Sequence, residues 1–143
     1  MAKVLAIDYG DKHVGLAIGD TKEYYIAPID VLSTGSFEDL FIQLNKLINE
    51  NHIEEVVIGY PLSMKGEKTD QTREVDKFSD ELSSRIDQQI ILEDERLTSA
   101  LAAKHQQGFL KKIWSGSNKN QIQKSSAVLI LETYLDKKKN EKK

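Results

Sequence analysis

The stretch Val4-Leu5-Ala6-Ile7-Asp8-Tyr9-Gly10 decides the fold that this sequence predicts. Its four consecutive apolar residues are typical of a strand that is covered on both faces of a sheet. A second apolar run, Val14–Asp20, follows the glycine, so the two runs together predict a β-hairpin over residues 3–20. Asp8 then ends a buried strand, where an ionised carboxylate is costly unless it is paired, hydrogen-bonded or bound to a metal. Two roles stay open here: a cap on the turn at Gly10, or a functional carboxylate.

The middle of the chain predicts strands that alternate with helices. A third strand is expected over residues 25–32, and Pro28 within it indicates an edge strand or a bulge. Apolar residues at helical spacing from Phe37 to Ile48 predict a helix with Ser36 as its N-cap. A short buried strand follows at 56–58. This strand–helix–strand succession indicates a parallel pairing with a right-handed crossover.

The element order of the whole chain is that of a ribonuclease H-like fold. The remaining predicted elements are a helix from Thr69 or Asp70, a strand at 90–92, a helix over 98–107 and a final helix over 119–137. The fold class expected is therefore α/β, with a mixed five-stranded sheet whose first three strands are antiparallel and whose last two are parallel, flanked by helices. We expect one domain over residues 1–136 and a basic, disordered tail over 137–143.

Composition is that of an ordinary globular protein, but the charge is unevenly distributed. Hydrophobic residues make up 39% and charged residues 30%, and the absence of cysteine excludes disulfides, thiolate metal sites and cysteine nucleophiles. Residues 1–95 carry 9 lysines and arginines against 20 acidic residues, whereas residues 96–131 hold six basic residues and no acidic one. A basic last third can present a positive face although the net charge is −3. The alternative is a solvated helix face.

Carboxylates gathered at strand ends indicate a metal-dependent site. Three consecutive acidic residues, Glu93–Glu95, end the fifth strand, and in the expected fold this end lies near Asp8. Such a cluster is stabilised by a cation, and oxygen ligands suit Mg²⁺ or Mn²⁺, two of which can promote phosphodiester hydrolysis. The basic segment 108–120 could hold a phosphate backbone while Trp114 stacks on a base. Ordinary packing of Trp114 in a loop is the alternative.

These motifs together resemble the YqgF (RuvX) family of Holliday-junction-resolvase-like nucleases, which is linked to pre-16S rRNA processing. The similarity extends over nearly the whole chain. Its most specific part is the string Asp94-Glu95-Arg96-Leu97-Thr98-Ser99. The other matching stretches are Asp8–Gly10 with Val14–Ala17, Val57–Ser63 with Gly66, and Ile122–Ala127 with Ile130–Leu131 and Tyr134–Leu135.

The resemblance implies roles for individual residues. Asp8 and Glu95 would be catalytic, metal-binding carboxylates, with Asp94 as the alternative if the strand register differs by one residue. The family usually has a catalytic aspartate where Gln123 stands; a glutamine carbonyl can ligate Mg²⁺ but contributes no charge. The family usually has an arginine where His13 stands, and histidine is charged only at lower pH. The nucleic-acid-binding set would be His13, Arg96, Thr98, Lys111, Lys112, Trp114, Lys119 and Lys124.

The function implied is a cytoplasmic, Mg²⁺- or Mn²⁺-dependent nuclease that processes the 5′ end of pre-16S rRNA in ribosome biogenesis. Its partners would be structured RNA or branched DNA, with ribosome-assembly particles as a further possibility. Two alternatives are a catalytically weakened or inactive nucleic-acid or ribosome-assembly binding factor, favoured by Gln123, and a Holliday junction resolvase. A resolvase that cuts two symmetric strands would require a two-fold dimer, so monomer and homodimer both stay open.

Overall fold

Strands β1 (Lys3–Tyr9) and β2 (His13–Asp20) form the predicted hairpin in the computed structural model of the chain. The structure describes residues 3–10, 12–22, 26–33, 36–94 and 119–141, and the backbone alone at 30–33, 119–125 and 139–141. The two strands pair antiparallel along their whole length, and the Gly10 N–H donates to the carbonyl of His13 at 3.0 Å, which closes the turn.

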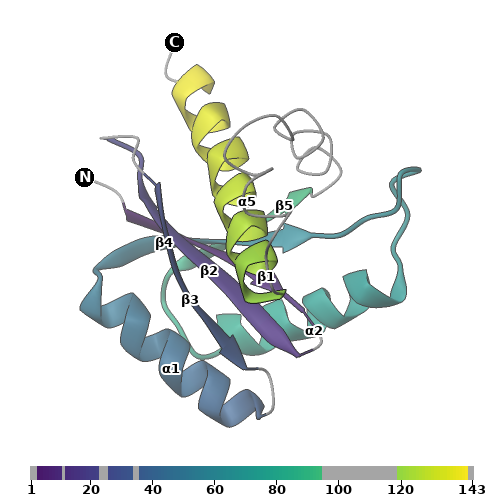
Figure 1. Ribbon diagram of the computed structural model, residues 1–143, viewed down its shortest axis with the longest axis horizontal. Coiled ribbons are helices and arrows are strands. Elements are labelled where there is room, and N and C mark those ends of the chain that lie inside the picture. The colour runs from purple at the N-terminus through teal and green to yellow at the C-terminus, as the bar shows by residue number, and fades with distance from the viewer. Residues whose placement is uncertain (1–2, 11, 23–25, 34–35, 95–118, 142–143) are drawn as a thin grey trace.

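The sheet has five strands in the order β3-β2-β1-β4-β5, as expected for a ribonuclease H-like fold (Figure 1). β3 (Ile26–Ser33) pairs antiparallel with β2, while β4 (Ile53–Tyr60) and β5 (Gln89–Asp94) extend the sheet in parallel from β1. β3 is an edge strand, where a proline such as Pro28 can be tolerated because one side of the strand has no neighbouring strand to pair with. β4 runs parallel to β3 but pairs with β1. The connection from β3 to β4 therefore crosses over β2 and β1 instead of joining two neighbouring strands.

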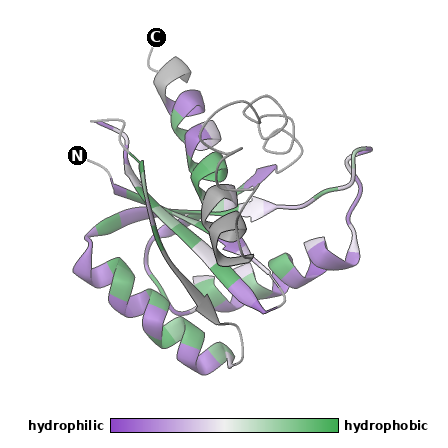
Figure 2. Cartoon of the chain, viewed as in Figure 1, coloured by the Kyte–Doolittle hydropathy of each residue, from purple (hydrophilic) through white to green (hydrophobic). Residues whose placement is uncertain are grey.

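Local side-chain capping starts both helices on one face of the sheet. α1 (Phe37–Glu50) begins after Ser36, whose hydroxyl accepts the N–H of Asp39 at 3.4 Å, as the sequence predicts. α2 (Asp70–Ser83) begins after Thr69 in a reciprocal capping box with Thr72. Hydrophilic and hydrophobic residues alternate along both helices (Figure 2), so each helix has one apolar stripe that it buries against the sheet.

Two apolar cores lie on opposite faces of the sheet. The larger one packs α1 and α2 against the side chains of alternate residues in β1, β2 and β4. The smaller one packs the last helix, α5 (Lys119–Glu141), against Val4, Ala6, Ala17 and Val57. Because β1 and β4 are covered on both faces, their apolar runs are nearly continuous, which is the pattern that predicted them.

α5 extends further than the sequence indicated. The last helix was expected to end near Lys137, whereas it continues to Glu141, and Lys137 itself pairs with Glu93 of β5. Buried Tyr134 and Leu135 fix the preceding turn, and lysine-rich sequence propagates a helix readily once a turn is fixed. The helix predicted over 98–107 lies outside the described residues. Within the described part of the chain, no helix is both long enough and apolar enough to cross a membrane.

His52 provides a stability prediction at the end of α1. It follows the C-cap Asn51 with a φ of 55°, in the left-handed region that favours glycine, and its side chain is exposed. We expect His52→Gly to raise the free energy of unfolding by about 0.5–1 kcal/mol, because glycine adopts this backbone without the Cβ clash. Urea denaturation measures this, with His52→Ala as the control that keeps the Cβ. Equal stability of the glycine and alanine variants would contradict the explanation.

Candidate active site

Asp8 lies at the carboxyl end of the central strand, on the face that α5 covers. Side chains alternate along a strand, and Val4 and Ala6 pack under α5 whereas Leu5 and Ile7 pack on the opposite face. The same alternation turns Asp8 toward the α5 face, where it is half-buried. The structure therefore has this carboxylate at the end of a buried strand, as the sequence predicts.

Two glycines flank Asp8, one on each neighbouring strand. Gly15 of β2 is paired directly opposite Asp8, and Gly59 of β4 is level with it, one residue beyond the pair of Ile7 and Ile58. Neither neighbour has a side chain that could fill the space beside the carboxylate. A glycine inside a strand often marks a place where a ligand or another backbone approaches closely. The sheet therefore leaves room around Asp8 on the α5 face.

The end of β5 brings a second carboxylate into the same row. Gly59 pairs with Glu93, so Asp8, Gly59 and Glu93 lie side by side across three parallel strands. Glu93 is only 4% exposed, and its Oε1 accepts a hydrogen bond from the Lys137 ammonium. Asp94 pairs with Tyr60, a residue of the opposite core. Alternation therefore directs Asp94 away from Asp8, and the next residue on the Asp8 face of an extended strand would be Glu95.

The first turns of α5 lie toward the Asp8 end of the sheet. The Tyr134 hydroxyl donates to Glu55 at 2.7 Å, and Glu55 pairs with Val4 at the opposite end of β1. Gln123 precedes Tyr134 by about three helical turns, which is a length of roughly 16 Å along α5. The length of β1 from Val4 to Asp8 is similar, roughly 13 Å. Figure 1 shows the N-terminal end of α5 above the end of the sheet where β1 stops and β2 begins. The backbone of Gln123 thus lies near the same end as Asp8.

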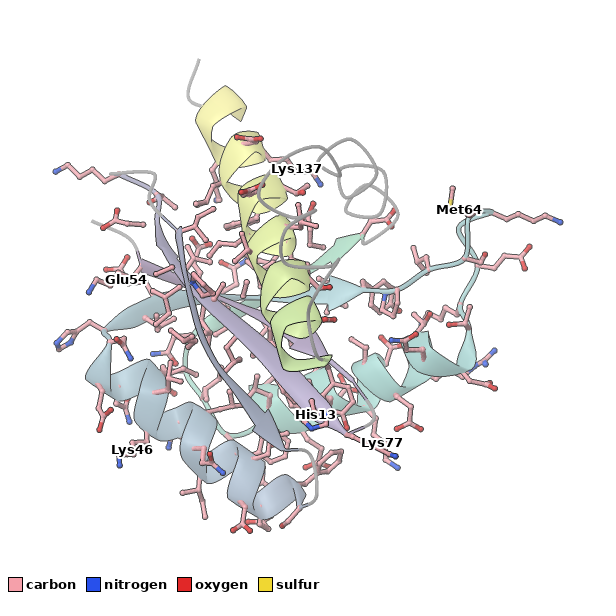
Figure 3. The ribbon with its side chains drawn as sticks, viewed as in Figure 1. His13, Lys46, Glu54, Met64, Lys77 and Lys137 are labelled. Carbon is pink, nitrogen blue, oxygen red and sulfur yellow. The ribbon has the colours of Figure 1, made fainter. Side chains whose placement is uncertain are left out.

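The predicted nucleic-acid-binding residues divide into three groups. His13 is the first residue of β2 and, like Ala17, belongs to the α5 face, near the Asp8 end (Figure 3). Lys119 and Lys124 lie in the first turns of α5, where the structure gives the backbone. The others, and the carboxylate of Glu95, lie outside the described residues: Arg96, Thr98, Lys111, Lys112 and Trp114.

A protruding loop follows β4 at the same edge of the sheet. The segment 61–69 extends away from the sheet with exposed Met64 at its tip (Figure 3). Its base is held by the Thr72 hydroxyl, which donates to the Pro61 carbonyl at 2.7 Å. The Lys68 ammonium donates to the Asp76 carboxylate at 3.0 Å, and this hydrogen bond is the main reason why the pKa of Lys68 is raised. This ion pair joins the loop to α2, which carries Asp76.

Several features of this site were missed in the sequence. Gly15 and Gly59 interrupt apolar strand patterns in the sequence. An isolated glycine in such a pattern indicates a place where another group can approach the backbone closely. No local sequence pattern could indicate that Glu93 pairs with Lys137, because the two residues are 44 positions apart in the chain. Among the described side chains, no three histidines, aspartates or glutamates converge as a metal site would require. Glu95 and Gln123, the other two predicted ligands, are not among those side chains.

Sequence comparisons identify the relatives of this chain. A family model described as RuvX, Holliday junction resolvase, matches residues 2–137. A protein of Maridesulfovibrio salexigens is 39% identical over 135 residues, covering 93% of this chain and 97% of the relative. A protein of Sulfurihydrogenibium sp. is 37% identical, covering 96% of this chain and 92% of the relative. Both relatives bear the name "putative pre-16S rRNA nuclease".

Solved structures share the fold at low sequence identity. Thermus thermophilus RuvC, solved in complex with a Holliday junction substrate, superposes with a TM-score of 0.63 at 12% identity and covers 96% of both chains. The fowlpox virus Holliday junction resolvase superposes with a TM-score of 0.55 at 11% identity, covering 94% of this chain and 99% of the viral one. These likenesses confirm the ribonuclease H-like architecture. The family match and the relatives, taken together, show that the chain belongs to the RuvX family.

Proposed function

We propose that this protein is a nuclease that hydrolyses phosphodiester bonds in structured nucleic acid, with the precursor of 16S rRNA as its substrate. The observation that carries the proposal is the position of Asp8. It ends the central strand between two glycines, on the face covered by α5. The names of the relatives supply the substrate, and bacterial rRNA precursors imply a cytoplasmic location.

Asp8, Glu95 and Gln123 would hold the divalent metal. The alternation along β5 supports Glu95 over Asp94 as the second carboxylate, since Asp94 pairs beside Tyr60 on the other face. Carboxylate and amide oxygens form a hard ligand set that suits Mg²⁺ or Mn²⁺. A bound ion of this kind lowers the pKa of a water molecule and stabilises the charge on the leaving oxygen.

The chain's own residues would orient the substrate around this set. Asp8, at the end of β1, and Glu95, which follows β5 in the sequence, would supply two negative charges, while Arg96 and Thr98 would contact the phosphate. His13 begins β2 on the α5 face, and Lys119 and Lys124 belong to the first turns of α5. These positions support a nucleic-acid path across the Asp8 end of the sheet, and Lys111, Lys112 and Trp114 would contact the same nucleic acid. Their contribution would be electrostatic attraction of the backbone and stacking on a base.

The test is cleavage of two labelled substrates in parallel, a fragment of pre-16S rRNA and a four-way DNA junction. We expect the wild-type protein to cut the RNA fragment with Mg²⁺ or Mn²⁺, and EDTA to stop the reaction. Preferential cleavage of the junction would support a Holliday junction resolvase instead, in which case sedimentation should show the two-fold dimer that paired cuts require. Binding of both substrates without cleavage of either would overturn the nuclease proposal.

Gln123 favours a second candidate function, a binding factor that keeps the fold but has lost catalytic strength. We expect Gln123→Asp to raise the cleavage rate about tenfold or more, because a third carboxylate adds charge where the metal is held. Initial rates at several Mg²⁺ concentrations measure this, and Gln121→Asp is a matched charge change two residues earlier in α5. Activity that appears only in Gln123→Asp would mean that the natural protein binds nucleic acid without cutting it.

A further inference from the structure

We propose that His13 is a further ligand of the divalent metal at Asp8, and that its imidazole nitrogen makes the site prefer a transition-metal dication such as Mn²⁺ to Mg²⁺. The two side chains come from neighbouring strands, Asp8 from the end of β1 and His13 from the start of β2. The inference rests on the proposed function only in that a divalent ion binds at Asp8. A nitrogen donor would distinguish this site from one that is built from oxygen ligands alone.

The hairpin register places His13 on the same face of the sheet as Asp8. Gly15 pairs directly with Asp8, and His13 lies two residues before Gly15 in β2. Residues two apart in a strand share a face, and Val14, which lies between them, packs in the larger core on the opposite face. His13 is therefore the diagonal neighbour of Asp8 on the α5 face. Diagonal Cα atoms in an antiparallel pair are about 7–8 Å apart, which an aromatic side chain can span.

Backbone pairing on both sides holds His13 in this place. Its carbonyl accepts the Gly10 N–H at 3.0 Å in the turn between β1 and β2, and its backbone pairs with Ser33 of β3. Figure 3 shows His13 at the end of the sheet where β2 begins. Gly15 has no side chain that could fill the space between the imidazole and the carboxylate. The fold therefore fixes the backbone of both ligands before an ion binds.

An imidazole beside a carboxylate is a ligand pair of mixed chemistry. Histidine is the most common metal ligand in proteins and suits transition metals, whereas Mg²⁺ prefers oxygen ligands. Asp8 and His13 are each half-buried, so water and the phosphate oxygens of a bound nucleic acid can take the remaining positions around the ion. Loss of the imidazole should therefore weaken Mn²⁺ binding much more than Mg²⁺ binding.

The chain has three histidines, and the other two provide matched controls. His13→Gln removes the imidazole nitrogen and offers an amide oxygen in its place. His52→Gln makes the same change at the exposed residue that follows the C-cap of α1. His105→Gln makes it in the segment outside the described residues. Asp8→Asn removes the carboxylate of the pair.

The first measurement is pulsed electron paramagnetic resonance of Mn²⁺ bound to the full chain without nucleic acid. A nitrogen atom bonded to Mn²⁺ modulates the electron spin echo, and an oxygen ligand does not. We expect this modulation in the wild type and in both control variants, and its loss in His13→Gln. Absence of the modulation in the wild type, or its retention in His13→Gln, would overturn the proposal. Its retention in Asp8→Asn would also overturn it, because the ion would then lie elsewhere.

Calorimetric titrations with Mn²⁺ and with Mg²⁺ test the selectivity, while urea denaturation shows that each variant is folded. We expect His13→Gln to weaken Mn²⁺ binding about tenfold or more, and Mg²⁺ binding by no more than about twofold. His52→Gln and His105→Gln should bind both ions as the wild type does. Equal weakening of the two ions in His13→Gln would overturn the proposal, because a merely structural role of His13 would have that effect.

Cleavage assays separate failure of this inference from failure of the proposed function. Cleavage by a wild-type protein whose bound Mn²⁺ shows no nitrogen modulation would support the nuclease and overturn the role of His13. Nitrogen modulation that depends on His13 and Asp8, without cleavage of the RNA fragment or the DNA junction, would overturn the nuclease and support the role of His13.

Discussion

Asp8→Asn is expected to abolish cleavage, lowering the rate at least about a thousandfold. Asparagine keeps the size and shape of the side chain but removes the negative charge at the end of β1. The flanking residues Gly15 and Gly59 have no side chain that could take over its role. A divalent ion at such a site supplies several kcal/mol of transition-state stabilisation, and each 1.36 kcal/mol corresponds to a tenfold change in rate.

Initial cleavage rates of the pre-16S rRNA fragment measure this effect, with the unfolding free energy measured alongside. The matched control is Asp80→Asn, which removes an exposed carboxylate from α2 and should leave the rate unchanged. The same pair of variants shows whether any cleavage comes from the protein rather than from a contaminating nuclease. An Asp8→Asn rate within about tenfold of the wild type would contradict the assignment of Asp8.

Phe78→Ala is expected to lower the free energy of unfolding by about 3–5 kcal/mol. Phe78 is fully buried on α2 and stacks on two other rings, with centroids 4.4 Å from Tyr9 and 5.7 Å from Phe41. It therefore connects the central strand to both helices of the larger core. Truncation removes buried apolar surface and leaves a cavity between elements that the sheet holds apart, so the core can collapse only partly.

Urea denaturation at constant m-value measures the loss. Phe78→Leu is the control, because leucine keeps most of the volume but not the ring contacts, and it should cost about 1–1.5 kcal/mol. A loss below about 2 kcal/mol in Phe78→Ala would show that the core relaxes around the missing ring. Tyr9, which stacks on Phe78, is the neighbour of Asp8 in β1, so the same variant should also lower the cleavage rate.

Local sequence patterns predicted most of the fold because they report burial along a single element. The apolar run before Asp8 indicated a strand covered on both faces, and β1 has that position. Ser36 was predicted as the cap of one helix, and the next helix was expected to begin at Thr69 or Asp70; the structure has Ser36 and Thr69 as N-caps whose side chains accept nearby backbone N–H groups. The end of α5 was predicted less well, since Lys137 looks like part of a solvated tail until its partner on β5 is known.

The site was predicted only as far as single strands and helices allow. Asp8 and the acidic end of β5 were identified from the sequence, as was the last helix that holds Gln123. The choice between Asp94 and Glu95 could not be made there, because a one-residue difference in register exchanges the two faces of a strand. The pairing of Tyr60 with Asp94 supports Glu95, which stays a prediction.

The sequence by itself determined the elements, their order and the carboxylate at the end of the first strand, because hydrophobic periodicity and capping act between residues a few positions apart. Only the tertiary structure decided which residues surround that carboxylate. Gly15 and Gly59 flank Asp8 through strand pairing, and Lys137 reaches Glu93 across the face of the sheet. These contacts join residues far apart in the chain. They depend on register and on the direction of α5, which no local pattern specifies.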